Sequence, residues 1–180
     1  MTPVHLPSEP SPWIVRFAHL VRAGGRVLDV AAGEGRHAAF FLSRGHAVTA
    51  VDRTTDALER LKRCDVRRLD LEDGAPWSLG GGWDAIVVTN YLHRPLLPAL
   101  PGALAPGGVL LYETFAQGHE RYGRPSRPEF LLRPGELLEA FVPPLTPVAY
   151  EHGLLLRARP CVIQRLVAVA GSADPLPLES

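Results

Sequence analysis

The sequence predicts an α/β protein whose mostly parallel sheet ends in an antiparallel hairpin. Short runs of Val, Ile, Leu and Ala alternate with helix-like segments between residues 26 and 113. Such alternation is typical of a parallel sheet with helices on both faces, because strands that are buried on both sides are apolar throughout. The last two strand-like runs, 148–151 and 161–170, are separated only by residues 152–160. A parallel crossover needs about a dozen residues or more, so we expect this pair to be antiparallel.

The first predicted helix follows an irregular lead-in that holds several prolines. Ser11 is a typical N-cap, Pro12 suits the first helical turn, and apolar residues then share one face until Gly24. Beyond this helix, apolar runs predict strands at residues 26–30, 47–51, 66–69, 85–89 and 108–113. The intervening segments and the stretch that Pro134 opens predict helices at residues 35–45, 54–63, 96–104 and 134–141.

Length and composition indicate one globular domain over residues 1–180, which is 46% hydrophobic and 21% charged. We expect an irregular lead-in at 1–10, a tail at 171–180, and a long connection at 114–132 that could act as a lid. The net charge is zero, so no general field attracts nucleic acid or an anionic membrane.

The two cysteines and the apolar runs favour a cytoplasmic location. Cys64 and Cys161 have no metal-ligand spacing and read as reduced thiols, so we expect no metal site. The N-terminus lacks the basic start and apolar stretch of a signal peptide. The longest apolar run, 96–111, is broken by proline and glycine and cannot form a lipid-facing span.

The first candidate site is a glycine-containing loop between a buried strand and a helix. Gly33 and Gly35 allow a tight turn and let a ligand lie against the backbone, and Asp29 near the strand end could meet a cationic amine. Asp52 ends the second strand, 19 residues after Gly33, where a carboxylate could accept both hydroxyls of a ribose. This spacing also matches the dinucleotide fingerprint, and a tight turn without any ligand remains an alternative.

Two further segments follow the third and fourth strands. Asp70 could accept a hydrogen bond from the exocyclic amine of adenine while the N–H of Leu71 faces a ring nitrogen. The alternative is a solvated acidic turn without a ligand, which is what we expect of Glu72 and Asp73. Asn90 and the residues after it lie at the switch point of the strand order, where α/β sheets bind ligands.

Together these four segments resemble the class I S-adenosylmethionine-dependent methyltransferases, and the tellurite-resistance-type and related small bacterial branch in particular. The resemblance covers nearly the whole chain and implies a Rossmann-like, seven-stranded sheet with S-adenosylmethionine as cofactor and S-adenosylhomocysteine as product. Ala31 stands in place of the usual first loop glycine, and His37 stands where that branch often has Asn. The residues that the resemblance implies for the cofactor site are Asp29, Ala31, Gly33, Gly35, Asp52, Arg53, Asp70, Leu71 and Asn90.

The expected reaction is transfer of the sulfonium methyl group to a small molecule by in-line displacement. Orienting the acceptor can supply roughly 7–11 kcal/mol in such a reaction, and a base helps only when the acceptor starts protonated. Our catalytic candidates are His93, Tyr91 and Glu113. The segment 114–132 mixes aromatic and arginine side chains, which suits an anionic or a planar acceptor.

Two other functions stay open, namely an NAD-binding oxidoreductase and a non-catalytic module that binds an adenosyl ligand. We expect no nucleic-acid partner, no membrane, and either a monomer or a homodimer.

Overall fold

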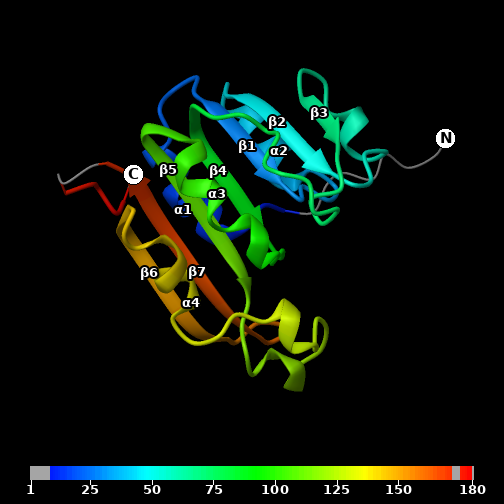
Figure 1. Cartoon of the computed structure of the whole chain (residues 1–180), viewed down its shortest axis with the longest axis vertical. Coiled ribbons are helices and arrows are strands. Elements are labelled where there is room, and N and C mark those ends of the chain that lie inside the picture. Colours follow the sequence, from blue (N-terminus) through cyan, green and yellow to red (C-terminus); the bar gives the residue numbers. More distant parts are fainter. Residues whose placement is uncertain (1–8, 172–174, 180) are drawn as a thin grey trace.

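Seven strands form one sheet in the order β3-β2-β1-β4-β5-β7-β6, which confirms the predicted fold class (Figure 1). The computed structural model describes residues 9–171 and 175–179. The strands pair in parallel from β3 to β5, whereas β7 runs antiparallel to both β5 and β6. Their bounds are Arg26–Val30, Ala47–Asp52, Asp65–Arg68, Trp83–Thr89, Leu104–Phe115, Leu145–Leu155 and Cys161–Ala170, for β1 to β7 in turn.

The first helix, α1 (Pro12–Phe17), begins where the sequence predicts, because the Ser11 side chain accepts a hydrogen bond from the backbone N–H of Trp13 at 3.2 Å. It continues as the 3-10 turn η1 (Ala18–Leu20) and ends sooner than expected. Trp13 and Phe17 are buried, so Trp13 packs against the sheet. Most of the predicted lead-in, residues 1–8, lies outside the described part of the chain, as do residues 172–174 and 180 of the predicted tail.

One predicted helix is wrong. Residues 54–63 form only the 3-10 turn η2 (Leu58–Arg60). Leu58 is fully buried and Leu61 partly so, and a spacing of three suits a single 3-10 turn. The rest of this short segment is mainly exposed and gives an α-helix little surface to pack, so propensity alone does not sustain one.

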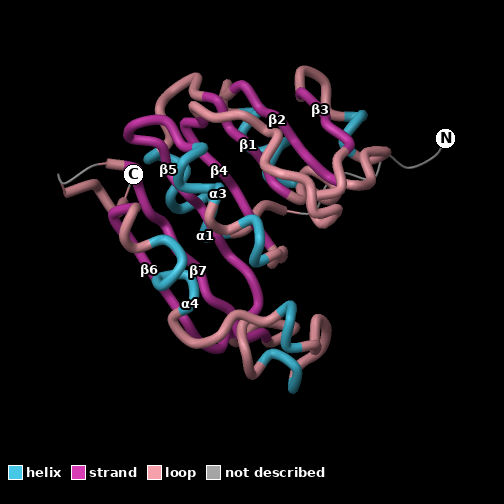
Figure 2. The backbone as a smooth tube through the Cα atoms, viewed as in Figure 1, coloured by secondary structure: helices cyan, strands magenta, loops and turns pink. Residues whose placement is uncertain are grey.

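The other helices are present but short (Figure 2). They are α2 (Arg36–Ser43), α3 (Ala99–Ala103) and α4 (Glu136–Phe141). The predicted helix at 96–104 is split, since residues Arg94–Leu96 form the 3-10 turn η3 and Leu104 already belongs to β5. Pro98 lies between η3 and α3 and explains the split, because proline cannot donate a helical hydrogen bond.

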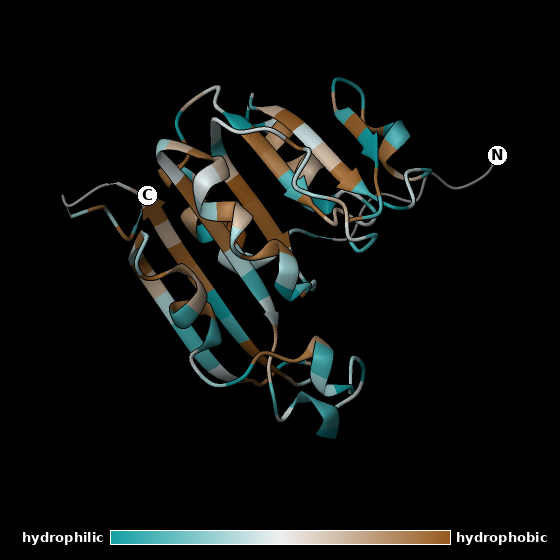
Figure 3. Cartoon of the chain, viewed as in Figure 1, coloured by the Kyte–Doolittle hydropathy of each residue, from teal (hydrophilic) through white to brown (hydrophobic). Residues whose placement is uncertain are grey.

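Apolar side chains from the strands fill two cores, one on each face of the sheet. Leu28 and Ile86 point into the core beneath α3 and α4, while Val27 and Val87 point into the core beneath α1 and α2. The central strands are accordingly hydrophobic along their length (Figure 3). Every residue of β4 except the last is buried, as the unbroken apolar run predicted.

The final hairpin is antiparallel, as its short connection predicted, but β6 is much longer than the expected strand at 148–151. It forms one edge of the sheet, and the register shifts between Pro147 and Ala149. Proline is tolerated there because an edge strand leaves some N–H groups without a ladder partner. Among the residues that the structure describes, no helix has the length and apolar character needed to cross a bilayer.

Candidate functional site

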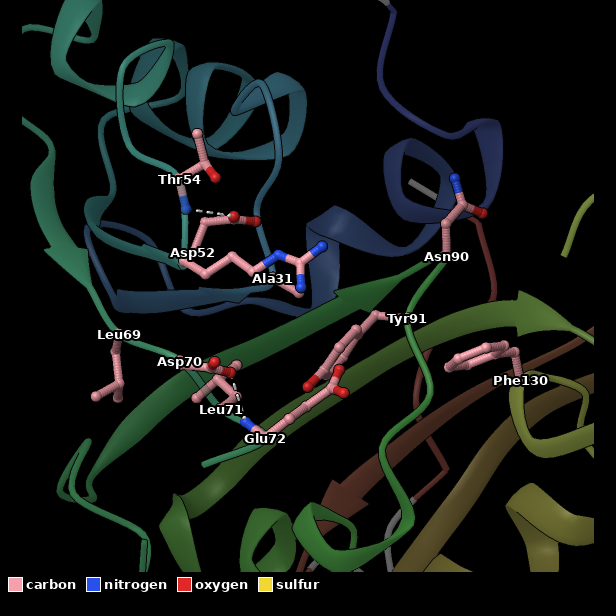
Figure 4. A pocket seen from close by; sticks show the side chains of 11 residues that line it. Ala31, Asp52, Thr54, Leu69, Asp70, Leu71, Glu72, Asn90, Tyr91 and Phe130 are labelled. Carbon is pink, nitrogen blue, oxygen red and sulfur yellow. Dashed lines mark hydrogen bonds between the residues drawn. The ribbon is translucent and has the colours of Figure 1, made fainter. Parts of the chain in front are cut away.

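A cavity of about 500 Å³ opens at the carboxyl ends of β1, β2, β3 and β4 (Figure 4). Its volume is in the range of small-molecule and cofactor sites, which are about 300–1,000 Å³. The position is the one that parallel α/β sheets use for ligands, because the strand order reverses there. The lining residues are Ala31, Asp52, Arg53, Thr54, Leu69, Asp70, Leu71, Glu72, Asn90, Tyr91 and Phe130.

The glycine-containing loop bends sharply between β1 and α2. Ala31 has a left-handed backbone with φ of 53°, and Gly33 and Gly35 have φ of 56° and 80°. Ala31 lines the cavity, whereas Gly33 turns its N–H toward Asp52 and donates a hydrogen bond to Oδ2 at 2.8 Å. Gly33 therefore supports the cavity wall without being part of its lining.

Gly35 is buried at the start of α2, where its lack of a side chain permits the η2 turn to approach the loop closely. A Cβ atom at this position would lie 2.7 Å from Leu58 Cδ2 and 2.7 Å from Leu61 Cδ1. The absence of a side chain thus lets the η2 turn pack directly under the loop. Gly35 contributes to the site through this packing, and the structure does not place it in the cavity lining.

Asp52 ends β2 and is held by the backbone on both oxygens. Oδ2 accepts from Gly33 N–H, and Oδ1 accepts from Thr54 N–H at 2.9 Å. Each carboxylate oxygen has a further lone pair, so the fixed group can still accept hydrogen bonds from the cavity. The Asp52 carboxylate is therefore placed to accept hydrogen bonds from two hydroxyl groups of one ligand.

Asp70 and Leu71 line the cavity directly after β3. Asp70 Oδ1 accepts a hydrogen bond from Glu72 N–H at 2.9 Å, which folds the chain into a tight turn. Glu72 and Asp73 are exposed, as expected of a solvated turn, and the turn also brings Glu72 to the cavity lining.

Asp29 lies beneath the loop and does not line the cavity. It is 1% exposed, and its Oδ2 accepts from Ala38 N–H at 2.9 Å, near the start of α2. Burial raises the pKa of Asp29 to about 7, although the hydrogen bond and the charge of Arg36 act in the opposite direction. The carboxyl group is therefore poised to gain or lose a proton near neutral pH.

Tyr91 points its ring into the cavity toward Glu72 (Figure 4). Its Oη atom is buried and lies beside the Glu72 carboxylate, without a hydrogen bond of standard geometry among the described residues. Burial and the negative charges of Glu72 and Asp70 raise the pKa of the phenol. A buried hydroxyl in this position can donate its hydrogen to the Glu72 carboxylate or to a ligand that enters the cavity.

Asn90 precedes Tyr91 and has a left-handed backbone with φ of 53°. Its N–H donates to the carbonyl oxygen of Glu113 at 2.9 Å, which fixes the turn after β4 against β5. Asparagine adopts this conformation more easily than most residues, which accounts for the residue type at the point where the chain enters the cavity.

The other two catalytic candidates lie outside the cavity lining. His93 is half-buried at the start of η3. Glu113 is 5% exposed; it accepts from Ser11 Oγ at 2.9 Å and pairs with Arg165 at 3.2 Å. Both carboxylate oxygens of Glu113 are thus bound within the protein, which indicates a structural role for this residue.

His37 belongs to the same buried polar group. Its Nε2 accepts from the backbone N–H of Ser11 at 3.1 Å, and its Nδ1 lies 3.2 Å from Thr89 Oγ1. Burial, with the charge of Arg36, lowers the pKa of His37 to about 3, so the ring stays neutral and can accept that bond. His37 thus joins the segment before α1 to the carboxyl end of β4.

The structure brings most of the predicted cofactor residues together. Those that share the cavity are Ala31, Asp52, Arg53, Asp70, Leu71 and Asn90. Thr54 and Leu69 also line the cavity and were not predicted to do so, although each lies within two residues of a predicted acid. Phe130 also lines the cavity and comes from the long connection after β5.

The strand order, the antiparallel β7 and the cavity at the strand tips define the fold of class I S-adenosylmethionine-dependent methyltransferases. The chain is similar to TehB from Haemophilus influenzae, with a TM-score of 0.73 and 17% identity over 89% of this chain. This chain spans 62% of that protein's length.

Two other solved structures have the same fold. The 1,6-didemethyltoxoflavin-N1-methyltransferase of Burkholderia thailandensis, solved with 1,6-didemethyltoxoflavin and S-adenosylhomocysteine, has a TM-score of 0.64 and 21% identity over 89% of this chain and 76% of its own. The N-methyltransferase NodS of Bradyrhizobium japonicum has a TM-score of 0.64 and 16% identity over 90% of this chain and 98% of its own. No protein-family model and no curated protein matches the sequence.

Proposed function

We propose that this protein transfers the methyl group of S-adenosylmethionine to a small-molecule acceptor. The observation that carries the proposal is the pair of carboxylates, Asp52 and Asp70, which line one cavity at the ends of neighbouring strands. Carboxylates so placed can hold the ribose hydroxyls and the adenine amine of one adenosyl group. The fold shared with methyltransferases supports the same conclusion.

The residues present fit this cofactor. Asp52 is fixed by two backbone N–H groups, so it needs no rearrangement to accept hydroxyl groups. The buried Tyr91 hydroxyl lies beside the Glu72 carboxylate, and the acids around it suit a ligand that carries positive charge. We propose that Asp29, which is buried beneath the loop, favours the ammonium group of the methionine portion through its negative charge and through the loop that it supports, without direct contact.

When bound, S-adenosylmethionine supplies a sulfonium methyl group: the acceptor's nucleophilic atom bonds to the methyl carbon as the carbon–sulfur bond breaks, the electron pair stays on sulfur, and any proton on the nucleophile passes to solvent. The chain's own residues bind and orient the reactants, which can contribute about 7–11 kcal/mol. Tyr91 lies in the cavity and can orient the acceptor, and its raised pKa keeps the phenol protonated. We propose a positioning role for Glu113, whose carboxylate is already paired with Arg165.

The sheet topology argues against the oxidoreductase alternative. The dinucleotide-binding fold needs a second mononucleotide-binding half built from parallel strands. Here the antiparallel β7 occupies the position next to β5. The alternative of a non-catalytic adenosyl-binding module makes the same binding prediction and differs only in turnover.

Calorimetry with S-adenosylhomocysteine tests the proposal. We expect Asp52→Ala to weaken binding by at least about tenfold, because hydrogen bonds to a charged group contribute about 1.5–3 kcal/mol each. The exposed Asp56, which does not line the cavity, provides a matched control in Asp56→Ala. Absence of binding by the folded wild-type protein at millimolar ligand would refute the proposal. Binding without transfer of labelled methyl to any acceptor would favour the non-catalytic module.

A further inference from the structure

The long connection after β5 reaches the cavity through one aromatic side chain. Of the described residues between 116 and 132, Phe130 is the one in the cavity lining, and it is 39% exposed. The segment is packed rather than loose at both ends: Ala116 pairs with Leu132, and both are fully buried. Phe130 is therefore an exposed aromatic ring that projects from an anchored piece of backbone.

Arg94 fixes the backbone on both sides of Phe130. Its Nη1 donates to the carbonyl oxygen of Glu129 at 2.7 Å, and its Nη2 donates to that of Leu131 at 3.0 Å. The same guanidinium group makes a bidentate pair with Glu136, at 2.6 Å and 3.0 Å. Bidentate pairs of this kind have a well-defined geometry. The backbone that carries the Phe130 ring is therefore held in a fixed position.

Phe130 lies across the cavity from the acids that suit the adenosyl group. Figure 4 shows Tyr91 between Phe130 on one side and Asp70, Leu71 and Glu72 on the other. The end of the cavity formed by Phe130, Tyr91 and Asn90 thus offers two aromatic rings and one amide. This end is available to a second molecule when the acids hold the first.

The charge around the cavity disfavours an anion. Its described lining contains three acids, Asp52, Asp70 and Glu72, against the single cation Arg53. Arg94 is already bound to Glu136, so it offers no free positive charge.

The arginines expected to attract an anion lie elsewhere. Arg127 pairs with Glu129 and lies over the Phe130 ring at 5.8 Å, and Arg133 pairs with Glu136 and Glu139. None of the arginines between 116 and 133 is in the cavity lining. A small oxyanion would therefore meet repulsion rather than a binding cation.

We propose that Phe130, positioned by Arg94 and Glu136, is a specificity-determining residue that selects a planar aromatic acceptor without negative charge. The inference rests on the proposed methyltransferase function and narrows its acceptor. An aromatic ring can stack on or meet the edge of Phe130, and its lack of charge avoids the acids of the lining.

Matched ring probes test both parts of the proposal. Quinoline-2-carboxamide and quinoline-2-carboxylate differ in charge but hardly in shape, and selenite represents small oxyanions. Binding of S-adenosylhomocysteine is measured first; its absence would refute the proposed function itself. The two quinoline probes are then titrated into the saturated protein and followed by saturation-transfer NMR and calorimetry, and selenite is added as a competitor.

We expect the carboxamide to bind at least about tenfold more tightly than the carboxylate, and selenite not to compete. Phe130→Ala should weaken carboxamide binding about two- to tenfold, the range of one aromatic contact, and Phe130→Trp should restore it. Tyr122→Ala is the matched control, since Tyr122 is 44% exposed on the same segment but outside the cavity lining. Failure of the carboxamide to bind, equal loss in both alanine variants, or tighter binding of the carboxylate or selenite would overturn the inference.

Discussion

Replacing Asp29 by Asn should change the pH dependence of stability in a defined direction. Asp29 is buried, and burial raises the pKa of its carboxyl group from 3.8 to about 7 in the folded chain. Because the folded pKa lies above the unfolded one, the folded state binds the proton more tightly. The contribution of Asp29 to stability is thus fully present below pH 3.8 and is lost as the pH rises through about 7.

The magnitude follows from the two pKa values. A difference of about three units corresponds to about 4 kcal/mol over the whole range, at 1.36 kcal/mol per unit. Between pH 4.5 and 7.5 the same relation gives a loss of about 3 kcal/mol from this one group. An asparagine side chain can still accept the hydrogen bond from Ala38 N–H but does not titrate.

Urea denaturation of the wild type and Asp29→Asn at several pH values between 4.5 and 7.5 measures the effect. The stability of the variant relative to the wild type should rise by about 3 kcal/mol over this interval and then level off. Asp84→Asn is the control: burial opposes ionisation of Asp84, but hydrogen bonds from Arg26 and Arg22 outweigh it and hold its pKa below 3.8.

Asp84 stabilises the fold above its unfolded pKa, and that contribution is lost only as the pH falls through the lower folded value. Its variant should therefore differ from the wild type by a nearly constant amount between pH 4.5 and 7.5. A stability difference between wild type and Asp29→Asn that does not change with pH would refute the raised pKa.

Three further predictions concern the loop, the first helix and the cofactor. Gly35→Ala should destabilise the fold by about 2–4 kcal/mol in urea titrations, because left-handed strain adds to a steric clash. Gly33→Ala has the strain without the clash and should cost only about 1 kcal/mol; equal costs would contradict the close packing. Ser11→Ala should cost about 1–3 kcal/mol in thermal or urea unfolding, since it removes the cap of α1 and one partner of buried Glu113; an unchanged stability would argue against this contact. Under the proposed function, the affinity for S-adenosylhomocysteine should rise with pH up to about pH 7 as Asp29 ionises, by at most about tenfold per pH unit, and calorimetry should show no such rise for Asp29→Asn.

The elements that sequence reasoning predicted best are those whose signal is local. The β4 run is apolar because both faces of that strand are covered, and the hairpin direction follows from a connection too short for a crossover. The helix predicted at 54–63 was wrong because the segment buries Leu58 in one 3-10 turn and is otherwise mainly exposed. Whether a short amphipathic segment forms a helix depends on the surface against which it can pack. The sequence of the segment alone does not specify that surface.

The sequence alone determined the chemistry at the strand ends. The glycine loop, Asp52 and Asp70 each follow a strand within the chain, and parallel strands necessarily bring their carboxyl ends to one edge. Only the tertiary structure decided which side chains share the cavity. It buried Asp29 under the loop and bound both carboxylate oxygens of Glu113 within the protein. Neither Asp29 nor Glu113 lines the cavity.

The structure also brought Phe130 into the cavity through contacts of Arg94 with residues 35 to 42 positions away. The physical reason is the range of the interactions. Turn and strand preferences act over a few neighbouring residues, whereas burial and ion pairing depend on segments that meet only when the whole sheet has assembled.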